Sequence, residues 1–338
     1  MALLDTKLNG TTNLLRVLCY GSAHSKKTWW AGTAAEAGFN VLFLEGDGNW
    51  SILQNINKKD HDRINVIDFS DKQKEAVFAK ALVRLLKQGK LIWDEATKTA
   101  TALKPFPESA VCIDLTKLTQ NDVVVVDSWT ALVYSLSVQY SRENGIDMSD
   151  PDKADRDYYG WAGKLALWVL NQLKTLPCHV VVIAHSTVYE KYSKDGKNME
   201  MQRRQPLSTS GPNAMQMASK FTDVLFFYAK GVAFKIDVSG DADKDGGSRS
   251  LAPKTYSWDE LQFKDLCKAA KVTMPVDNPI LDMSQESEAA PAVEEKKQPA
   301  LGVVKNNEAS VSVQKPVELK TPQTEALATK SFTLGAKK

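Results

Sequence analysis

The fold of this chain is decided by the stretch Leu14-Leu15-Arg16-Val17-Leu18-Cys19-Tyr20-Gly21-Ser22-Ala23-His24-Ser25-Lys26-Lys27-Thr28. Its apolar first half predicts a buried strand, and the Gly/Ser/Lys segment after it predicts a loop that leads into a helix. A phosphate-binding loop has a glycine, four further residues and then Gly-Lys-Ser/Thr. Gly21, Lys27 and Thr28 fall in this register, whereas Lys26 replaces the second glycine.

The chemistry of such a loop explains why these residue types matter. Backbone N–H groups at a helix N-terminus surround phosphate, the lysine binds the β- and γ-phosphates, and the hydroxyl binds Mg²⁺. Lys26 places a side chain where the backbone should approach the phosphate closely, so the sequence leaves open whether ATP is hydrolysed. The residues expected to hold the nucleotide are Gly21, Ser22, Ala23, His24, Ser25, Lys26, Lys27 and Thr28.

Strand and helix signals alternate over about the first 275 residues. The segment 122–127 contains four consecutive valines, which is typical of a strand buried on both faces. Further strands are predicted at 41–44, 180–184, 224–228 and 232–238, with a small hairpin from strands at 90–94 and 99–103. Helices are predicted at 27–37, 71–87, 128–140 and 158–176, and a last one that starts at a capping box of Ser257 and Glu260. This alternation predicts an α/β fold, with a mostly parallel central sheet covered by helices on both faces.

An acidic residue ends the four-valine strand. Asp127 lies about 100 residues beyond the loop, where an acid on the Mg²⁺ side of the site is expected. Thr28 and Asp127 are therefore the predicted metal-side residues. The alternative is that Asp127 or Ser128 only caps the following helix, and both roles are compatible.

Two other strand ends carry polar residues. Glu45 and Asp47 flank a glycine after strand 41–44, where a carboxylate could orient the water that attacks the γ-phosphate. The alternative is a Gly/Asp-rich turn. His185 follows strand 180–184 and could sense the γ-phosphate, or it could be a structural histidine.

These features, in this order, resemble the RecA-like ATPase core. More narrowly, they resemble phage-encoded RecA-like ATPases, often described as AAA-domain or phage nucleotide-binding proteins, that accompany single-strand annealing and recombination. The likeness covers roughly residues 10–275 and is carried by residues 20–28, 38–44, 125–128, 182–185 and 207–211. It implies a RecA-like P-loop NTPase that binds ATP and Mg²⁺, acts on single-stranded DNA and forms homo-oligomers.

The resemblance also implies roles for individual residues. Asp47 stands at the position of the family's catalytic glutamate, with a carboxylate one methylene shorter, and His185 stands at the position of the polar sensor. The segment Gly246-Gly247-Ser248-Arg249 is similar to one that reaches a neighbouring subunit's nucleotide. Arg249 is then a candidate trans-acting arginine finger, or else an exposed arginine in a Gly/Asp-rich loop.

A long polar stretch, 186–212, is the candidate DNA-binding segment. Basic residues alternate there with two tyrosines, which suits the phosphates and bases of a single strand. A loop of this length within a compact domain favours function over a merely solvated loop. The predicted contact residues are Tyr189, Lys191, Tyr192, Lys194, Arg203 and Arg204.

Composition limits the remaining possibilities. The formal net charge is +2, which excludes a global basic field for nucleic acid and leaves only local patches. Four separated cysteines without a CxxC pair argue against a zinc site and a disulfide scaffold. Without a signal pattern or a membrane-length apolar run, we expect no membrane association and a cytoplasmic location, in the host cytoplasm if the protein is phage-encoded.

The sequence predicts a domain over residues 1–276, with the hairpin as an insertion near 90–104, and a disordered tail over 277–338. Phe332 and Leu334 in the tail could dock a single-strand-binding or annealing protein, although a featureless chain end is the alternative. Two other functions stay open: a pseudo-ATPase that binds nucleotide and loads partners without turnover, and a helicase-like motor.

Overall fold

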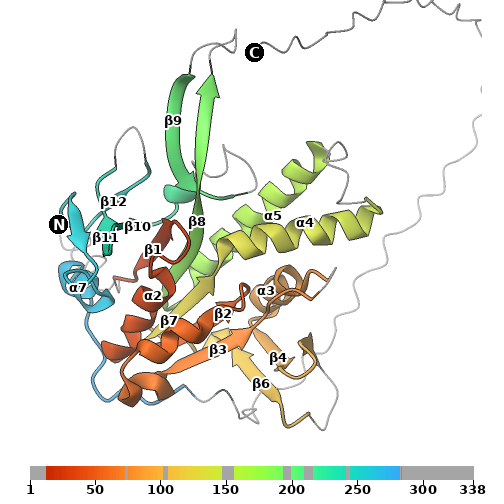
Figure 1. Ribbon diagram of the computed structural model, residues 1–338. Helices are drawn as coiled ribbons and strands as arrows, with labels where there is room; N and C mark the ends of the chain where they lie inside the picture. The colour runs from red at the N-terminus through yellow and green to blue at the C-terminus, as the bar shows by residue number, and fades with distance from the viewer. Residues whose placement is uncertain are drawn as a thin grey trace, which may run out of the picture. The chain divides into compact units, whose positions relative to one another are not determined.

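The computed structural model describes residues 13–72, 75–101, 106–146, 156–192, 199–208, 216–240, 244–281 and 283. Within this part of the chain a ten-stranded sheet forms the centre of the fold (Figure 1). Its strands, from edge to edge, are β13 (Thr255–Ser257), β11 (Ala233–Asp237), β10 (Asp223–Lys230), β1 (Arg16–Gly21), β8 (His179–Tyr192), β7 (Asp122–Asp127), β2 (Asn40–Glu45) and β3 (Ile64–Asp68). In addition, β12 (Gly247–Ser248) pairs with β10, and β9 (Met199–Pro206) pairs with β8.

Helices cover both faces of this sheet, as the sequence predicts. Alternate strand residues point to opposite faces, so one core contains Val123 and Val125 and the other contains Val124 and Val126. The first core is completed by α2 (Lys27–Glu36) and α7 (Phe263–Ala269), the second by α3 (Val77–Gln88), α4 (Trp129–Asn144) and α5 (Arg156–Thr175). Short 3₁₀ helices span Trp50–Asn55, Lys58–Arg63 and Leu115–Lys117. The predicted α/β class with a mostly parallel sheet is thus confirmed.

Parallel pairing brings the strand ends that carry polar residues to one edge of the sheet. Strands β10, β1, β8, β7, β2 and β3 run parallel in this order. Gly21 lies opposite His185, and Glu45 lies opposite Asp127. The four central strands therefore deliver the predicted site residues to the same carboxyl edge.

The segment predicted as a long loop is in large part a β-hairpin. Strand β8 continues past the sheet to Tyr192, and β9 returns antiparallel to it, so the pair projects from the body of the molecule (Figure 1). The backbone N–H of Leu207 donates to the carbonyl of His185 (2.8 Å) and closes the base of this hairpin. Polar side chains on both strands hide this pairing from a search for apolar alternation.

Two predicted helix starts were wrong. Helix α3 begins at Val77, because the Asp71 carboxylate accepts the N–H of Phe78 (2.9 Å) and holds the preceding residues outside the helix. Helix α7 begins at Phe263, after a capping box made by Gln262 and Asp265. The predicted box exists only in part, since the Ser257 N–H donates to the Glu260 carboxylate (2.9 Å) but no helix follows directly.

The predicted hairpin insertion is part of a small three-stranded antiparallel sheet. Strand β4 (Lys90–Asp94) lies between β5 (Thr99–Ala100) and β6 (Ala110–Asp114), in the order β5-β4-β6. The sequence indicates the first two strands and misses the third. Trp93 of β4 is buried against Phe69, which joins this sheet to the core beside β3.

Packing contacts of the domain continue beyond residue 276. The Asn278 side-chain amide donates to the carbonyls of Asn121 (3.1 Å) and Gly38 (3.4 Å), and the N–H of Cys112 donates to the Met283 carbonyl (2.8 Å). Residues 277–281 and 283 therefore pack with the domain. The remainder of the predicted tail, with Phe332 and Leu334, lies outside the described residues. Within the described residues no helix is long and apolar enough to cross a membrane.

A buried histidine, His179, makes the stability of the fold depend on pH. The ring of His179, at the start of β8, accepts the N–H of Leu15 at Nδ1 (2.9 Å) and packs edge-on against Phe39. Burial, and then the nearby charge of Arg16, lower the pKa of His179 to about 4. The unfolded value is about 6.5, so the folded chain keeps this ring neutral where the unfolded chain would protonate it.

We therefore expect acid to destabilise the domain through His179. Its contribution is fully present above pH 6.5 and is lost as the pH falls toward 4, with a total of about 3 kcal/mol. His179→Asn keeps an acceptor for Leu15 but cannot be protonated, so its free energy of unfolding should fall less over this range. Urea unfolding from pH 7 to 4 measures the difference, and parallel pH profiles for the two proteins would contradict the assignment.

Candidate nucleotide-binding site

The phosphate-loop residues lie between the end of β1 and the start of α2, as predicted. Gly21 ends β1 with a φ of +154°, and the exposed residues Ser22, Ala23 and His24 follow. The Ser25 hydroxyl donates back to the Ser22 carbonyl (2.7 Å). This tight local bonding turns the chain from a strand into a helix N-terminus, the backbone setting that binds anions.

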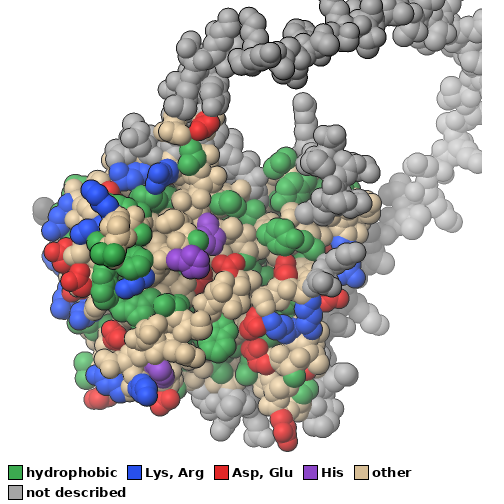
Figure 2. Space-filling view, viewed as in Figure 1, with side chains coloured by type: hydrophobic (Ala, Val, Ile, Leu, Met, Phe, Trp, Pro, Cys, Tyr) green, Lys and Arg blue, Asp and Glu red, His purple; other side chains and the backbone are tan. Residues whose placement is uncertain are grey.

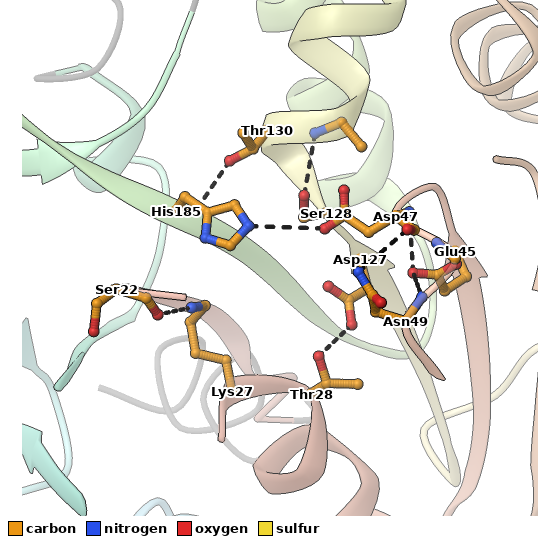
Figure 3. Close-up of polar contacts among 12 residues, drawn as sticks. Ser22, Lys27, Thr28, Glu45, Asp47, Asn49, Asp127, Ser128, Thr130 and His185 are labelled. Carbon is orange, nitrogen blue, oxygen red and sulfur yellow. Dashed lines mark hydrogen bonds and ion pairs between the residues drawn. The ribbon is translucent and has the colours of Figure 1, made fainter. Parts of the chain in front are cut away.

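Lys27 is the buried cation of the loop. It is only 6% exposed, and its Nζ donates to the carbonyl of Ser22 (2.7 Å; Figure 3). The same Nζ donates to the carbonyl of Gly21 (3.3 Å) and to the Ser25 hydroxyl (3.3 Å). Burial lowers the pKa of Lys27 to about 8, against the opposing charge of Asp127. The ammonium thus lies inside the concave side of the loop.

Thr28 and Asp127 meet although 99 positions separate them. The Thr28 hydroxyl donates to the Asp127 carboxylate (2.6 Å; Figure 3). Asp127 is 4% exposed, and burial raises its pKa to about 7; the Thr28 bond opposes this rise, and the charges of Glu45 and Asp47 add to it. A nearby cation stabilises the charged form of a carboxylate that is buried among other acids.

Glu45 has a structural task in this geometry. Its carboxylate accepts the backbone N–H groups of Asp47 (3.0 Å), Gly48 (2.6 Å) and Asn49 (3.4 Å), and so it holds the turn after β2. Burial raises the pKa of Glu45, and these three bonds oppose the rise. With both oxygens engaged, Glu45 is less suited than Asp47 to activate a water.

Asp47 and His185 face each other across the site. The distance from His185 Nε2 to the Asp47 carboxylate is 3.9 Å (Figure 3). The Asp47 side chain is 26% exposed. Burial, and next the charge of Lys27, lower the pKa of His185. Its backbone N–H donates to the Thr130 hydroxyl (2.9 Å), which fixes β8 to the first turn of α4. The space-filling view shows histidine and acidic side chains together near the middle of this face (Figure 2).

The residues present fit a magnesium–nucleotide. A hydroxyl and a carboxylate are the hard oxygen ligands that Mg²⁺ prefers, and Thr28 and Asp127 are already in contact. A helix N-terminus and the Lys27 ammonium supply the positive ends that a phosphate chain needs. Mg²⁺, when bound there, would neutralise charge that develops on the phosphates.

Two further residues at this edge have structural tasks, of which the sequence indicated one. Ser128 caps α4 by accepting the N–H of Ala131 (3.1 Å), one of the two roles left open for residues 127 and 128. Thr130, which sequence reasoning missed, anchors His185. Its place in the first turn after the Asp127 strand was the available signal, because that turn faces the carboxyl edge of the sheet.

Arg249 lies away from this site. Its N–H donates to the Thr222 carbonyl (3.2 Å), and Thr222 in turn bonds to Arg16 at the start of β1. The exposed Arg249 is therefore at the amino edge of the sheet, opposite the phosphate loop. Arg249 is therefore not part of the site formed by Lys27, Thr28 and Asp127 within this chain.

The predicted DNA-binding residues divide between two strands. Tyr189, Lys191 and Tyr192 belong to β8, and Arg203 and Arg204 belong to β9. The register pairs Tyr189 with Arg203, and Arg204 is exposed. Lys194 lies outside the described residues.

Known proteins resemble this chain in sequence pattern and in fold. Residues 13–255 match a family model described as an AAA domain. Among solved structures, the crystal structure of the RadB recombinase has 14% identity and a TM-score of 0.40, covering 75% of this chain and 91% of that one. A second solved structure, described as an ATPase domain, has 12% identity and a TM-score of 0.33, covering 76% of this chain and 84% of that one. No curated protein matches the sequence.

Proposed function

This chain belongs to the AAA domain family, and on that premise we propose that it binds and hydrolyses ATP and acts on single-stranded DNA in recombination, annealing or replication. The observation that carries the proposal is the 2.6 Å contact between Thr28, at the start of α2, and Asp127, at the end of β7. It brings the two predicted metal-side residues together beside the buried ammonium of Lys27.

The geometry supports a separate role in hydrolysis for each of these residues. Lys27 and the loop N–H groups would bind the phosphates, and Thr28 and Asp127 would hold Mg²⁺. Asp47, at the open side of the site, orients the water whose oxygen attacks the γ-phosphorus as the bond to ADP breaks. His185 lies within 3.9 Å of Asp47 and is placed to respond to the γ-phosphate.

ATP hydrolysis with and without single-stranded DNA tests the proposal. We expect Mg²⁺-dependent turnover that DNA stimulates, and a loss of about a hundredfold or more in Asp127→Asn, which keeps the shape but removes the charge. Asp68→Asn, on the neighbouring strand β3, is the control and should keep full activity. If the wild-type protein bound ATP but did not hydrolyse it, the proposal would be wrong and the pseudo-ATPase would take its place.

One observation favours that second candidate, a nucleotide-binding protein without turnover. Lys26 stands where the loop normally has its second glycine. It occupies the N-cap position of α2 with a φ of +67°. In this candidate the site binds ATP as a structural or switching ligand while the chain loads or bridges partners. Homo-oligomers with Arg249 acting between subunits belong to the first candidate, since hydrolysis is what such a residue would assist.

The projecting β8–β9 hairpin supports the DNA-binding part of the proposal. Strand β8 spans His179–Tyr192, so it contains both His185, beside the nucleotide site, and the outer part of the hairpin. A change at His185 therefore acts on the strand that carries Tyr189, Lys191 and Tyr192. ATP, and not ADP, should then raise the affinity for single-stranded DNA.

Neutralising the predicted basic contact residues of segment 186–212 should weaken DNA binding and leave ATP binding unchanged. Replacing Lys191, Lys194, Arg203 and Arg204 with glutamine should also flatten the salt dependence, by about 0.7 in the log–log slope for each phosphate that is no longer neutralised. Anisotropy over a salt series measures both effects. His185→Ala should abolish the difference between ATP and ADP. If the quadruple variant bound DNA with unchanged affinity and slope, the DNA site would lie elsewhere or the protein would have none.

A further inference from the structure

The backbone of Lys26 is in a conformation that side-chain-bearing residues rarely adopt. Its φ of +67° and ψ of +20° lie in the left-handed region, at the N-cap of α2. Glycine reaches this region at no steric cost, but in a lysine the Cβ is forced against the backbone. Such a conformation persists only where contacts with the surrounding structure offset its cost.

Three aromatic rings supply such an interaction. Lys26 Nζ lies 4.0 Å from the ring centroid of Trp258, 4.5 Å from that of Phe234 and 5.8 Å from that of Trp29. Trp29 and Trp258 also contact each other edge to face, with centroids 5.0 Å apart. An ammonium within about 6 Å of an aromatic face is attracted by the ring quadrupole. We refer to Trp29, Phe234 and Trp258 as the aromatic box.

The aromatic box is joined to the loop's own helix by independent bonds. Trp30 Nε1 donates to the Leu261 carbonyl (2.7 Å), and the N–H of Phe263 donates to the Thr33 hydroxyl (3.2 Å). These bonds fix the segment after β13, which carries Trp258, on α2. Two of the three rings, Trp29 on α2 and Trp258 on this segment, are thus held next to each other independently of Lys26.

We propose that Lys26 is a positioning residue: the cation–π contact with the aromatic box holds its backbone in the left-handed conformation and keeps the phosphate loop in its anion-binding shape. The lysine then replaces the missing glycine by a different physical means. This inference rests on the proposed nucleotide binding. It also makes the loop depend on Phe234 and Trp258, which lie more than 200 positions away in the sequence.

A double-mutant cycle between Lys26 and Trp258 tests the inference. The proteins are the full chain, Trp258→Leu, Lys26→Gly and the double variant, and the probes are Mg-ATP and inorganic tripolyphosphate. Trp258→Leu should weaken binding of both probes by about threefold to tenfold when Lys26 is present, the scale of a cation–π contact. It should have little effect when residue 26 is glycine, which needs no anchor. Lys26→Arg keeps the cation and should bind like the parent. Lys26→Met keeps an unbranched side chain but removes the cation, and it should resemble Trp258→Leu.

Two binding results would overturn the inference. Equal weakening of both probes by Trp258→Leu in the two backgrounds would show that the ring supports the fold without Lys26. Weakening of ATP but not of tripolyphosphate would show that the ring contacts the base. The same double-mutant cycle, measured on the free energy of unfolding without nucleotide, tests the Lys26–Trp258 contact separately from nucleotide binding. A coupled Lys26–Trp258 pair in a protein that binds neither probe would refute the proposed function, and ATP binding without any coupling would refute the role of Lys26.

Discussion

Replacing Lys27 with alanine should weaken Mg-ATP binding by about a hundredfold or more, the scale of a buried charge-assisted contact. The ammonium is 6% exposed and already lies within the curve of the loop, against the carbonyls of Gly21 and Ser22. A compact positive charge at this place cannot be supplied by a neighbour, because Lys26 is engaged with the aromatic box. Titration calorimetry with Mg-ATP measures the change in affinity.

Lys26→Ala is the matched control for this prediction. It removes an adjacent lysine of the same type, but one that acts through the loop backbone, so its effect on affinity should stay within about tenfold. The free energies of unfolding of both variants should be compared with that of the parent, so that misfolding is recognised. If Lys26→Ala abolished binding while Lys27→Ala bound ATP like the parent, the loop would be assigned in the wrong register.

Gly21→Ala should destabilise the domain by about 3 kcal/mol or more, the cost of forcing a group into a filled space. A Cβ on Gly21 would lie 1.9 Å from the carbonyl oxygen of Phe227 on the neighbouring strand β10, and the φ of +154° is unfavourable for any side chain. Neither β1 nor β10 can move aside easily, since both lie inside the sheet, paired on both sides, with buried residues on both faces. Urea unfolding measures the effect.

Gly145→Ala is the control for the backbone part of this cost. Gly145 ends α4 with a φ of +64°, and a Cβ there would meet nothing within 4 Å. Its replacement should cost only about 1 kcal/mol, through the left-handed backbone alone. Equal destabilisation by the two variants would show that the contact with Phe227 relaxes.

The site could be predicted from sequence to the extent that its parts are contiguous. The loop from Gly21 to Thr28 is a local pattern, and Asp127 follows a run of valines that only a doubly buried strand explains. The meeting of Thr28 and Asp127 then follows from parallel topology, because carboxyl ends of parallel strands share one edge. The distinct tasks of Glu45 and Asp47 did not follow, because they depend on which carboxylate the turn after β2 engages.

The hairpin shows a second limit of sequence patterns. Residues 186–192 are mostly polar and lack the apolar alternation that marks a half-buried strand, so the pattern predicts a loop. Their pairing with β9 is a backbone effect that side-chain hydrophobicity does not report. The start of α3 was misplaced for a similar reason, since the Asp71 carboxylate bonds to Phe78 across seven positions.

The sequence by itself determined the α/β class, the residues of the phosphate loop and the polar residues at the ends of the central strands. Each of these depends on periodicity or on adjacent residues. Only the tertiary structure decided how a lysine can stand in place of the loop glycine. The aromatic box that accepts Lys26 is assembled from α2, β11 and the segment after β13. Such a contact between distant segments depends on how the layers pack, and no local pattern around residue 26 encodes it.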